Sequence, residues 1–311
     1  MNILITGGTG FIGSKLAYFL KKKKNKVVIL DKKIDKKKKI ILNGIKILKT
    51  DLTSKKSLAK IRIKKGYTVL HLAGQPSAAE SFKFPIDDLN KNIIGTVNLI
   101  EWCKANKVKK IIYASTFNVY EENAKKPKLS ENNNNQLKSL YAISKFSAEN
   151  YIKVYCSHLG IKWNIMRMFN VYGPGQDPKN NFLGMISIFL NMARKKKIIN
   201  VKGSLKRFRD FVYIDDVIDA WHRIIIDKKN YNKIYNVGSG KKTSLKKLFK
   251  NISLVVKKKL IIKEKKGTPG DFLGCYADLS KINRDLKFKP KFNLMKGLKE
   301  FNYWLENEKS K

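Results

Sequence analysis

The sequence predicts an α/β fold built on a doubly wound parallel sheet, and three observations support this. Short apolar runs rich in β-branched residues alternate with amphipathic stretches over the first half of the chain, as in β-α-β units. A glycine-rich turn joins the first apolar run to the first amphipathic stretch. With 311 residues and a hydrophobic fraction of 43%, the chain can bury a core of one or two domains.

The elements are expected in the following order. A strand at 3–6, a helix at 11–20 and a strand at 27–30 form the first β-α-β unit. Further strands are expected at 45–48, 68–72, 111–114 and 163–169, with long helices at 87–105 and 140–158. Strands that alternate with helices form a mostly parallel sheet, whose ligands bind at the carboxyl ends of the strands.

The alternation changes after residue 169, where the loop Asn170-Val-Tyr-Gly-Pro-Gly-Gln-Asp-Pro begins. A helix at 182–193 and shorter mixed segments follow, so a smaller mixed α/β domain is expected over 170–311, to bind the substrate. The first domain is expected to span 1–169, with 234–238 returning to its sheet. Residues 132–135 are four asparagines and predict a loop.

The charge balance is strongly basic, with 67 Lys and Arg against 24 Asp and Glu and a net charge of +43. Such a charge attracts nucleic acid or phosphorylated substrates. The lysine runs at 21–24, 36–39, 195–197 and 257–259 are dispersed at expected helix ends and loops, however, without interleaved aromatics. Ile and Asn are also abundant, and Lys, Ile and Asn all have A/T-rich codons. Codon bias of the genome therefore explains the lysine excess best. Nucleic-acid binding is the alternative.

Cysteine usage and hydropathy indicate a cytoplasmic protein that does not enter a membrane. Cys103, Cys156 and Cys275 are dispersed and odd in number, and they lack the spacing of metal or redox pairs, so reduced packing residues are expected and no metal site is. No apolar run reaches the roughly 20 residues that span a bilayer, and no secretory leader is recognised.

The turn Thr6-Gly-Gly-Thr-Gly-Phe-Ile-Gly13 follows a strand and opens a helix. Gly7, Gly10 and Gly13 permit a tight turn and a close backbone approach, and Phe11 and Ile12 begin the helix. A pyrophosphate placed there meets the positive end of the helix dipole. The sequence therefore predicts a Rossmann-type dinucleotide site.

Asp31, at the end of the second strand, predicts NAD rather than NADP. Its carboxylate can accept hydrogen bonds from both ribose hydroxyls and repels a 2′-phosphate. Lys32 and Lys33 follow directly and could instead accommodate that phosphate. NAD is the favoured cofactor, with NADP as the alternative.

Two short loops after later strands are expected to complete the cofactor site. Asp51 and Leu52 follow the third strand and are positioned to meet the adenine. Leu72, Ala73 and Gly74 follow the fourth strand and are positioned to line the cofactor's path. Each pair or triplet could also be an ordinary turn.

Tyr141 and Lys145 lie four residues apart, so a helix presents both from one face. A phenol titrates near 10, and lowering its pKa by about 3 units needs roughly 4 kcal/mol of stabilisation of the phenolate. Lys145, together with the positive charge of a nicotinamide, could supply it. Ser115 and Thr116 directly follow the fifth strand at the cofactor edge, where a hydroxyl could hold a substrate oxygen.

Eight ordered motifs extend this pattern over nearly the whole chain. On these motifs the chain resembles the extended short-chain dehydrogenase/reductase family, in its branch of nucleotide-sugar epimerases and dehydratases. The motifs are Gly7-Gly-Thr-Gly-Phe-Ile-Gly13, His71-Leu-Ala-Gly74, Asn92-Ile-Ile-Gly-Thr96, Ala114-Ser-Thr-Phe-Asn-Val-Tyr120, Tyr141-Ala-Ile-Ser-Lys145, Phe169-Asn-Val-Tyr-Gly-Pro174, Arg209-Asp-Phe-Val-Tyr-Ile-Asp-Asp216 and Asn236-Val-Gly-Ser-Gly240.

The resemblance implies roles for individual residues. Tyr141 would take a proton from a sugar hydroxyl while hydride leaves for NAD, and Thr116 would hydrogen-bond the same oxygen. Lys145 would tune Tyr141 and hold the nicotinamide ribose. The remaining contacts would come from Asn92, Ser115 and Phe169 to the cofactor, Asn170 to the nucleotide sugar and Arg209 to its diphosphate. Asn170 could instead cap a loop, and Arg209 could form an ion pair.

The residues after Thr116 favour one reaction within this branch. Sugar 4,6-dehydratases resemble one another in placing Asp-Glu there, whereas this chain has Phe117 and Asn118, which exchange no protons at neutral pH. An epimerase that borrows and returns hydride needs no such groups. We therefore expect a nucleotide-sugar epimerase, acting at C4 of a UDP-hexose. The alternatives are a dehydratase, decarboxylase or reductase of the same family, or a non-catalytic regulatory or RNA-binding relative.

Two segments depart from the family pattern. Thr268-Pro-Gly-Asp271 stands where the family often has Arg-Pro-Gly-Asp, so one diphosphate cation is missing, and Lys265 or Lys266 could replace it. Gln75-Pro-Ser77 matches no particular sugar specificity. The apolar faces of the helices at 87–105 and 140–158 correspond to the four-helix dimer interface of relatives, so a homodimer is expected. These faces could instead only cover the sheet.

Overall fold

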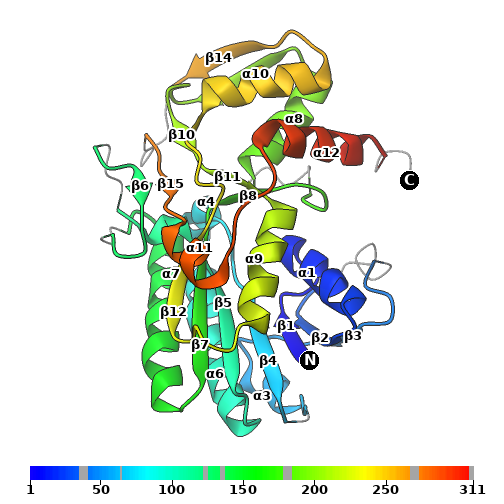
Figure 1. Ribbon diagram of the computed structural model, residues 1–311, viewed down its shortest axis with the longest axis vertical. Coiled ribbons are helices and arrows are strands. Elements are labelled where there is room, and N and C mark those ends of the chain that lie inside the picture. The colour runs from blue at the N-terminus through cyan, green and yellow to red at the C-terminus, as the bar shows by residue number, and fades with distance from the viewer. Residues whose placement is uncertain are drawn as a thin grey trace. The chain divides into compact units, whose positions relative to one another are not determined.

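The structure, a computed structural model, describes residues 1–34, 41–63, 65–121, 125–133, 137–177, 184–266 and 273–307 (Figure 1). The chain forms two compact units. The first comprises Met1–Val119, Leu137–Arg167 and Ala220–Tyr235. The second comprises Tyr120–Gln136, Met168–Asp219 and Asn236–Lys311. Helix α9 and strand β12 contain residues of both units.

A seven-stranded parallel sheet with flanking helices forms the centre of the first unit, which confirms the predicted Rossmann-type α/β fold. Its strand order is β12-β7-β5-β4-β1-β2-β3. The register pairs Ile3 of β1 with Val27 of β2 and with Thr68 of β4. The strands are β1 Asn2–Thr6, β2 Lys26–Asp31, β3 Lys46–Lys49, β4 Tyr67–His71, β5 Lys110–Thr116, β7 Lys162–Met168 and β12 Lys233–Val237.

Helices of the first unit pack on this sheet with their apolar faces. Leu99 and Trp102 of α6 and Ala148 of α7 belong to one buried cluster with Leu4 and Ile111 of the sheet. Phe19 of α1 meets His222 of α9, with ring centroids 5.2 Å apart. The helices are α1 Phe11–Lys22, α3 Lys55–Ala59, α4 Ala78–Lys83, α5 Pro85–Leu89, α6 Gly95–Ala105, the 3₁₀ turn η2 Phe117–Val119, α7 Leu140–Tyr151 and α9 Ile214–Ile226.

Both long helical stretches expected from the sequence are observed, and each contains a π-helical segment that the sequence did not indicate. The first begins at Pro85, and η1 (Asn90–Ile94) separates α5 from α6. The second changes to η3 (Ile152–Cys156) after α7. A π turn accommodates one extra residue within an otherwise helical run and is frequent at functional sites. Asn92, a predicted cofactor residue, lies in η1.

The second unit combines helices with short two-stranded sheets. In these sheets β11 pairs with β8, β14 with β9, β15 with β6 and β10 with β13. The predicted helix at 182–193 is observed as α8, and residue 182 lies outside the described residues. The elements are β6 Lys128–Leu129, β8 Asn170–Tyr172, α8 Met185–Lys195, β9 Ile198–Lys202, β10 Phe208–Arg209, β11 Phe211–Tyr213, β13 Thr243–Ser244, α10 Leu245–Val256, β14 Ile261–Lys265, β15 Tyr276–Ala277, α11 Ser280–Leu286 and α12 Leu294–Asn307.

Three of the four lysine runs lie at the C-terminal ends of helices α1, α8 and α10. Cations there interact favourably with the helix dipole, which gives these lysines a local role. The run at 36–39 lies outside the described residues, as does the segment at 268–271, and of the 132–135 loop only residues 132 and 133 are described. The three cysteines are buried and form no disulfide. Within the described chain, no helix is both long and apolar enough to cross a bilayer.

Candidate active site

The glycine turn between β1 and α1 has the geometry of an anion-binding site. Gly7 has a φ of +67°, and a Cβ there would lie 2.7 Å from the backbone nitrogen of Ala73. A Cβ at Gly13 would lie 2.3 Å from the Gly7 carbonyl oxygen, and Gly10 donates its N–H to that oxygen at 3.1 Å. No side chain caps the N-terminus of α1. The first N–H groups of this helix, which belong to Phe11, Ile12 and Gly13, therefore suit a pyrophosphate.

Asp31 holds the glycine turn from the end of β2. Its Oδ2 accepts hydrogen bonds from the Thr9 backbone N–H at 2.9 Å and the Thr9 hydroxyl at 2.7 Å. Its Oδ1 accepts the N–H of Lys33 at 3.2 Å. The carboxylate that we expected to receive ribose hydroxyls is thus also the anchor of the turn.

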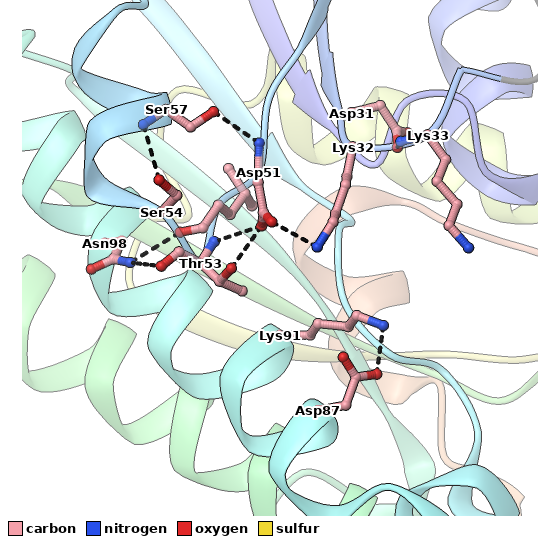
Figure 2. Close-up of polar contacts among 11 residues, drawn as sticks. Asp31, Lys32, Lys33, Asp51, Thr53, Ser54, Ser57, Asp87, Lys91 and Asn98 are labelled. Atoms are coloured by element: carbon pink, nitrogen blue, oxygen red, sulfur yellow. Dashed lines mark hydrogen bonds and ion pairs between the residues drawn. The ribbon is translucent and has the colours of Figure 1, made fainter.

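Lys32 reaches across to Asp51 at the end of β3, as Figure 2 shows. Lys32 Nζ lies 2.7 Å from Asp51 Oδ2, and Asp51 Oδ1 accepts the N–H and the hydroxyl of Thr53. The hydrogen bond to Asp51 raises the pKa of Lys32. Burial raises the pKa of Asp51, but the hydrogen bonds from Lys32 and Thr53 outweigh it and lower the pKa overall. Figure 2 shows the Lys33 side chain directed away from Asp51.

Leu52 is held next to this pair by the neighbouring helix. The side-chain amide of Asn98, on α6, donates to the carbonyls of Leu52 at 3.0 Å and Thr53 at 3.2 Å (Figure 2). Leu52 is buried. The two residues predicted to meet the adenine are therefore fixed from three directions, by Lys32, by Asn98 and by the turn after β3.

The segment after β4 is positioned by a chain of buried hydrogen bonds through His71. Its Nδ1 lies 2.8 Å from the Thr6 hydroxyl, and its Nε2 lies 2.9 Å from the Thr96 hydroxyl. The Thr96 hydroxyl donates to the Asn92 carbonyl, which leaves Nε2–H as the donor of His71. Burial, with the Lys145 charge, lowers the pKa of His71 to about 3. The imidazole is therefore neutral, and its hydrogen bonds join β4 to Thr6 and Thr96.

Leu72, Ala73 and Gly74 follow His71 along the same edge of the sheet. The N–H of Leu72 bonds the Thr6 carbonyl at 3.1 Å, and the N–H of Ala73 reaches the Thr6 hydroxyl at 3.2 Å. A Cβ at Gly74 would lie 2.5 Å from Asn92 Oδ1, so this position admits only glycine unless Asn92 moves. Thus β1 fixes the start of this segment and Asn92 limits its end.

Tyr141, Lys145 and Thr116 are brought together at the carboxyl end of β5. Tyr141 and Thr116 share a side-chain hydrogen bond, and Lys145 Nζ donates to the Ala114 carbonyl at 2.6 Å. The Lys145 ammonium also lies 4.2 Å from the centre of the Tyr113 ring, a cation–π contact. The three predicted catalytic residues therefore meet in one buried cluster.

The pKa values of this cluster differ from the simple expectation. Burial raises the pKa of Tyr141 to about 12, even though the Thr116 hydrogen bond opposes the change. Burial lowers the pKa of Lys145 to about 7, against the raising effect of the Glu149 and Asp88 carboxylates. Lys145 alone does not lower the pKa of Tyr141, because desolvation of both groups dominates.

Sequence reasoning missed two pairs of residues that surround Lys145. Glu149, one turn after Lys145 on α7, forms a buried ion pair with Arg167 of β7, whose Nη2 lies 2.6 Å from Glu149 Oε2. Ser115, predicted to contact the cofactor, donates its hydroxyl to Glu149 Oε1. Asp88 and Ser144 are buried and hydrogen-bonded to Asn92. The four-residue spacing from Lys145 to Glu149 and the place of Ser144 inside the Tyr141–Lys145 motif were the available sequence signals.

Phe169, Asn170 and Arg209 lie in the second unit. Phe169 is buried and donates its backbone N–H to Val237. Asn170 donates both its backbone N–H and its side-chain amide to the Asp210 carbonyl, each at 3.1 Å. Arg209 is buried, and its Nη1 bonds the Phe208 carbonyl at 2.7 Å and the Leu273 carbonyl at 3.3 Å.

Asp210, which sequence reasoning missed, organises the neighbouring loops of this unit. Its carboxylate accepts the N–H and hydroxyl of Ser239, the N–H of Gly240 and the N–H of Ala277, over 2.6–3.0 Å. Ser239 and Gly240 belong to the Asn236-Val-Gly-Ser-Gly240 motif. Asp210 therefore joins two of the motifs on which the family resemblance was based.

The fold and the cluster at the strand ends define a Rossmann-type enzyme of the short-chain dehydrogenase/reductase class, whose glycine turn fits NAD. The sequence pattern of the NAD dependent epimerase/dehydratase family matches residues 3–238. The chain belongs to this family, and NAD is its cofactor. The predicted NAD-dependent epimerase family is thereby confirmed.

Three similar proteins are named as epimerases. A putative UDP-glucose 4-epimerase of Methanocaldococcus jannaschii is 34% identical over 306 residues, covering 98% of each chain. A structure of UDP-glucose 4-epimerase with UDP-glucose from Thermotoga maritima has a TM-score of 0.92 at 30% identity and 99% coverage of both chains. The UDP-glucose 4-epimerase of Thermus thermophilus in complex with NAD has a TM-score of 0.89 at 28% identity, covering 98% of this chain and 99% of that one.

Proposed function

We propose that this chain is a UDP-hexose 4-epimerase that interconverts UDP-glucose and UDP-galactose. The observation that carries the proposal is the buried Tyr141–Thr116 pair beside Lys145, followed by Phe117 and Asn118 rather than by an acid and a base. Hydride can be exchanged at such a site, but water cannot be eliminated without further proton-transferring groups. The substrates named for the similar Methanocaldococcus and Thermotoga proteins support the same choice.

NAD supplies a hydride acceptor and a positive charge when it is bound. Tyr141 then removes the proton from the sugar's C4 hydroxyl at its Oη, and Thr116 holds the same oxygen with its hydroxyl. The C4 hydrogen would pass to bound NAD as hydride, which would leave a 4-keto sugar. After the keto sugar had presented its opposite face, hydride would return to C4 from the reduced cofactor, and Tyr141 would give the proton back to the oxygen.

Lys145 is the group in this chain that stabilises the phenolate of Tyr141. Its ammonium is fixed by the Ala114 carbonyl and the Tyr113 ring, so it cannot turn away from the reacting centre. Burial strengthens the attraction between the charged ammonium and the phenolate, while it also lowers the pKa of Lys145 to about 7. The charge of the bound cofactor adds to it, which explains how a phenol with a raised pKa can act as a base near neutral pH.

The other predicted site residues are assigned as follows. The glycine turn holds the pyrophosphate, and Asp31, Asp51 and Leu52 receive the adenosine. Leu72 to Gly74, Asn92, Ser115 and Phe169 border the rest of the cofactor. Asn170 and Arg209 bind the nucleotide sugar. For Arg209 the proposal requires that some of its five N–H donors reach the diphosphate while Nη1 stays on the Phe208 carbonyl.

The direct test incubates the pure protein with UDP-glucose or UDP-galactose in the absence of added reductant. We expect each sugar to be converted into the other, with no net change in the absorbance of NADH. A steady accumulation of NADH would indicate a dehydrogenase, and release of water to give a stable keto sugar would indicate a dehydratase. Failure to convert any sugar in a panel of nucleotide sugars would refute the proposal.

We further propose that the protein is a homodimer. Exposed apolar side chains gather on α5, η1 and the α7–η3 helix of the first unit, among them Ile86, Ile94, Tyr151 and Val154. Val154 is 72% exposed, and the two helical segments pack against each other. Val154→Glu should yield a monomer in light scattering, whereas Lys104→Glu, at the C-terminal end of α6, should leave the dimer intact. A wild-type monomer at micromolar concentration would exclude this assembly.

The three buried cysteines, none of them in a disulfide, fit a reducing compartment. We therefore place the enzyme in the cytoplasm. Labelling of all three thiols in freshly unfolded protein from intact cells would support this, and a protected pair would contradict it.

A further inference from the structure

Asp88 is a buried carboxylate to which the mechanism above assigns no role. It lies at the end of α5 and is 1% exposed. Asn92 Nδ2 donates to Asp88 Oδ1 at 3.1 Å, and the Ser144 hydroxyl is hydrogen-bonded to the same carboxylate. Burial raises the pKa of Asp88, and these hydrogen bonds and the Lys145 charge oppose that rise by stabilising the ionised form. Asp88 is therefore a buried carboxylate of the first unit rather than a surface group.

The two partners of Asp88 connect it to the reacting residues. Ser144 directly precedes Lys145 on α7, and its hydroxyl lies 3.1 Å from the carbonyl of Tyr141. Asn92 Oδ1 accepts the N–H of Gln75 at 2.9 Å. A point beside Gly74, where a Cβ would stand, lies 2.5 Å from Asn92 Oδ1 and 3.9 Å from Lys145 Nζ. Asn92 and the ammonium are therefore neighbours on the same side of this segment.

Each element that packs around Lys145 contributes a charged or titratable group that faces it. Asp88 comes from α5, Glu149 and Tyr141 from α7, Tyr113 from β5 and His71 from β4. His71 is neutral. Glu149 is paired with Arg167 and still raises the pKa of Lys145 more than Asp88 does. Among the described residues, Asp88 is hydrogen-bonded to Asn92 and Ser144, which are both neutral, and the Lys145 ammonium is a cation that acts on its carboxylate.

We propose that Asp88 is a positioning residue that sets the working pH of the epimerase by holding a negative charge, through Asn92 and Ser144, next to Tyr141 and Lys145. A negative charge favours the protonated form of both groups. Asp88 raises the pKa of Tyr141 and also that of Lys145, in each case after the larger effect of burial. Removing its charge should therefore move both pKa values in the same direction, downward.

This inference rests on the roles proposed for Tyr141 and Lys145. In a bell-shaped pH profile, the rising limb follows deprotonation of the base and the falling limb follows loss of the ammonium, and both limbs belong to the coupled pair. Without the Asp88 charge, the whole bell should move to lower pH by about one unit. A residue that only supports the fold would lower the height of the bell and leave its position unchanged.

The test compares Asp88→Asn with Asp87→Asn, a matched control that removes the same charge one residue away. Asp87 is half-exposed and paired with Lys91 on the helix surface (Figure 2), so its removal should leave the profile in place. Ser144→Ala removes one hydrogen bond of Asp88 and keeps the charge. It should lower the height of the bell without moving it. Asp88→Ser also removes the charge and has a smaller side chain, so it replaces Asp88→Asn in this comparison if Asp88→Asn does not fold.

A second measurement uses the cofactor-free protein and does not depend on activity. Competitive labelling with acetic anhydride over a pH series, read by mass spectrometry of the Lys145 peptide, gives the pKa of this amine. We expect a value near 7 in the wild type and a lower value in Asp88→Asn, with no change in Asp87→Asn. Equal Lys145 values in Asp88→Asn and the wild type would overturn the inference, as would an unmoved bell.

Failure of the proposed function has a different signature. If Tyr141→Phe keeps wild-type activity, the roles assigned to Tyr141 and Lys145 are wrong, whatever Asp88 does. If Tyr141→Phe is inactive but Asp88→Asn leaves both the bell and the Lys145 pKa in place, only the inference about Asp88 fails.

Discussion

The adenosine end and the reaction end of the proposed cofactor site hold their charges in opposite ways. At the adenosine end, Lys32 and Asp51 form an ion pair whose side chains are 57% and 29% exposed (Figure 2). At the reaction end, Glu149 and Arg167 are 0% and 3% exposed. Water screens the first pair and is excluded from the second. The exposed end can therefore exchange partners with a ligand, whereas the buried end fixes protonation states.

Breaking the buried pair should have the largest effect on stability. Glu149→Gln leaves Arg167 without its carboxylate partner inside the first unit, at a cost of about 3–5 kcal/mol in the free energy of unfolding. Urea denaturation measures this change. Glu306→Gln, which removes a carboxylate that lies 3.9 Å from Arg194 and is half-exposed, is the control and should cost far less. Equal losses in the two variants would contradict the contrast drawn here.

Acidification should weaken the reaction end through His71. Its pKa is about 3 in the folded chain and about 6.5 when exposed. Because the folded pKa is the lower one, the stabilisation is complete above pH 6.5 and is lost as the pH falls from 6.5 towards 3. The difference in unfolding free energy between the wild type and His71→Asn should shrink over this range. A pH-independent difference for His71→Asn would mean that the imidazole has the same pKa in the folded and the unfolded chain, and would contradict this expectation.

Changing the exposed pair should have the smallest effect on stability and a measurable effect on ligand choice. Lys32→Met should alter the free energy of unfolding by about 0.5 kcal/mol or less, and this change should vanish in high salt. Asp51→Asn releases Lys32 from its partner, so adenosine 2′,5′-bisphosphate should stabilise this variant more than it stabilises the wild type. Thermal midpoints with that ligand and with ADP measure the difference. No gain for the bisphosphate would show that Lys32 does not reach the 2′-position.

The strand pattern and the ordered motifs predicted the sheet well, because period and propensity are local signals. The π turns in η1 and η3 could not be predicted in the same way, since one extra residue in a helical turn barely changes the apolar spacing. The cluster around Lys145 was predicted only in part. Tyr141, Lys145 and Thr116 stand in recognisable spacing, and Ser144 lies within the same motif as Tyr141 and Lys145. Asp88 and Arg167, in contrast, reach the site from distant positions that only the fold brings together.

Three predictions from the sequence are not tested by the described residues. The lysine run at 36–39 and the Thr268–Pro–Gly–Asp271 segment lie outside them, and the boundary at residue 170 between the two predicted domains stays a prediction. The lowering of the Tyr141 pKa by Lys145 together with the nicotinamide charge stays a prediction. The sequence did not reveal how strongly burial raises the pKa of Tyr141 and lowers that of Lys145. Burial is a property of the packed fold and outweighs a single neighbouring charge here.

The central claim is that hydride leaves C4 of the sugar and returns to the same carbon within one binding event. UDP-glucose carrying deuterium at C4, incubated with the enzyme and an excess of unlabelled NADH in solution, tests it most directly. The account predicts UDP-galactose that retains the deuterium at C4. Loss of the label to the solvent or to the added cofactor pool would contradict it.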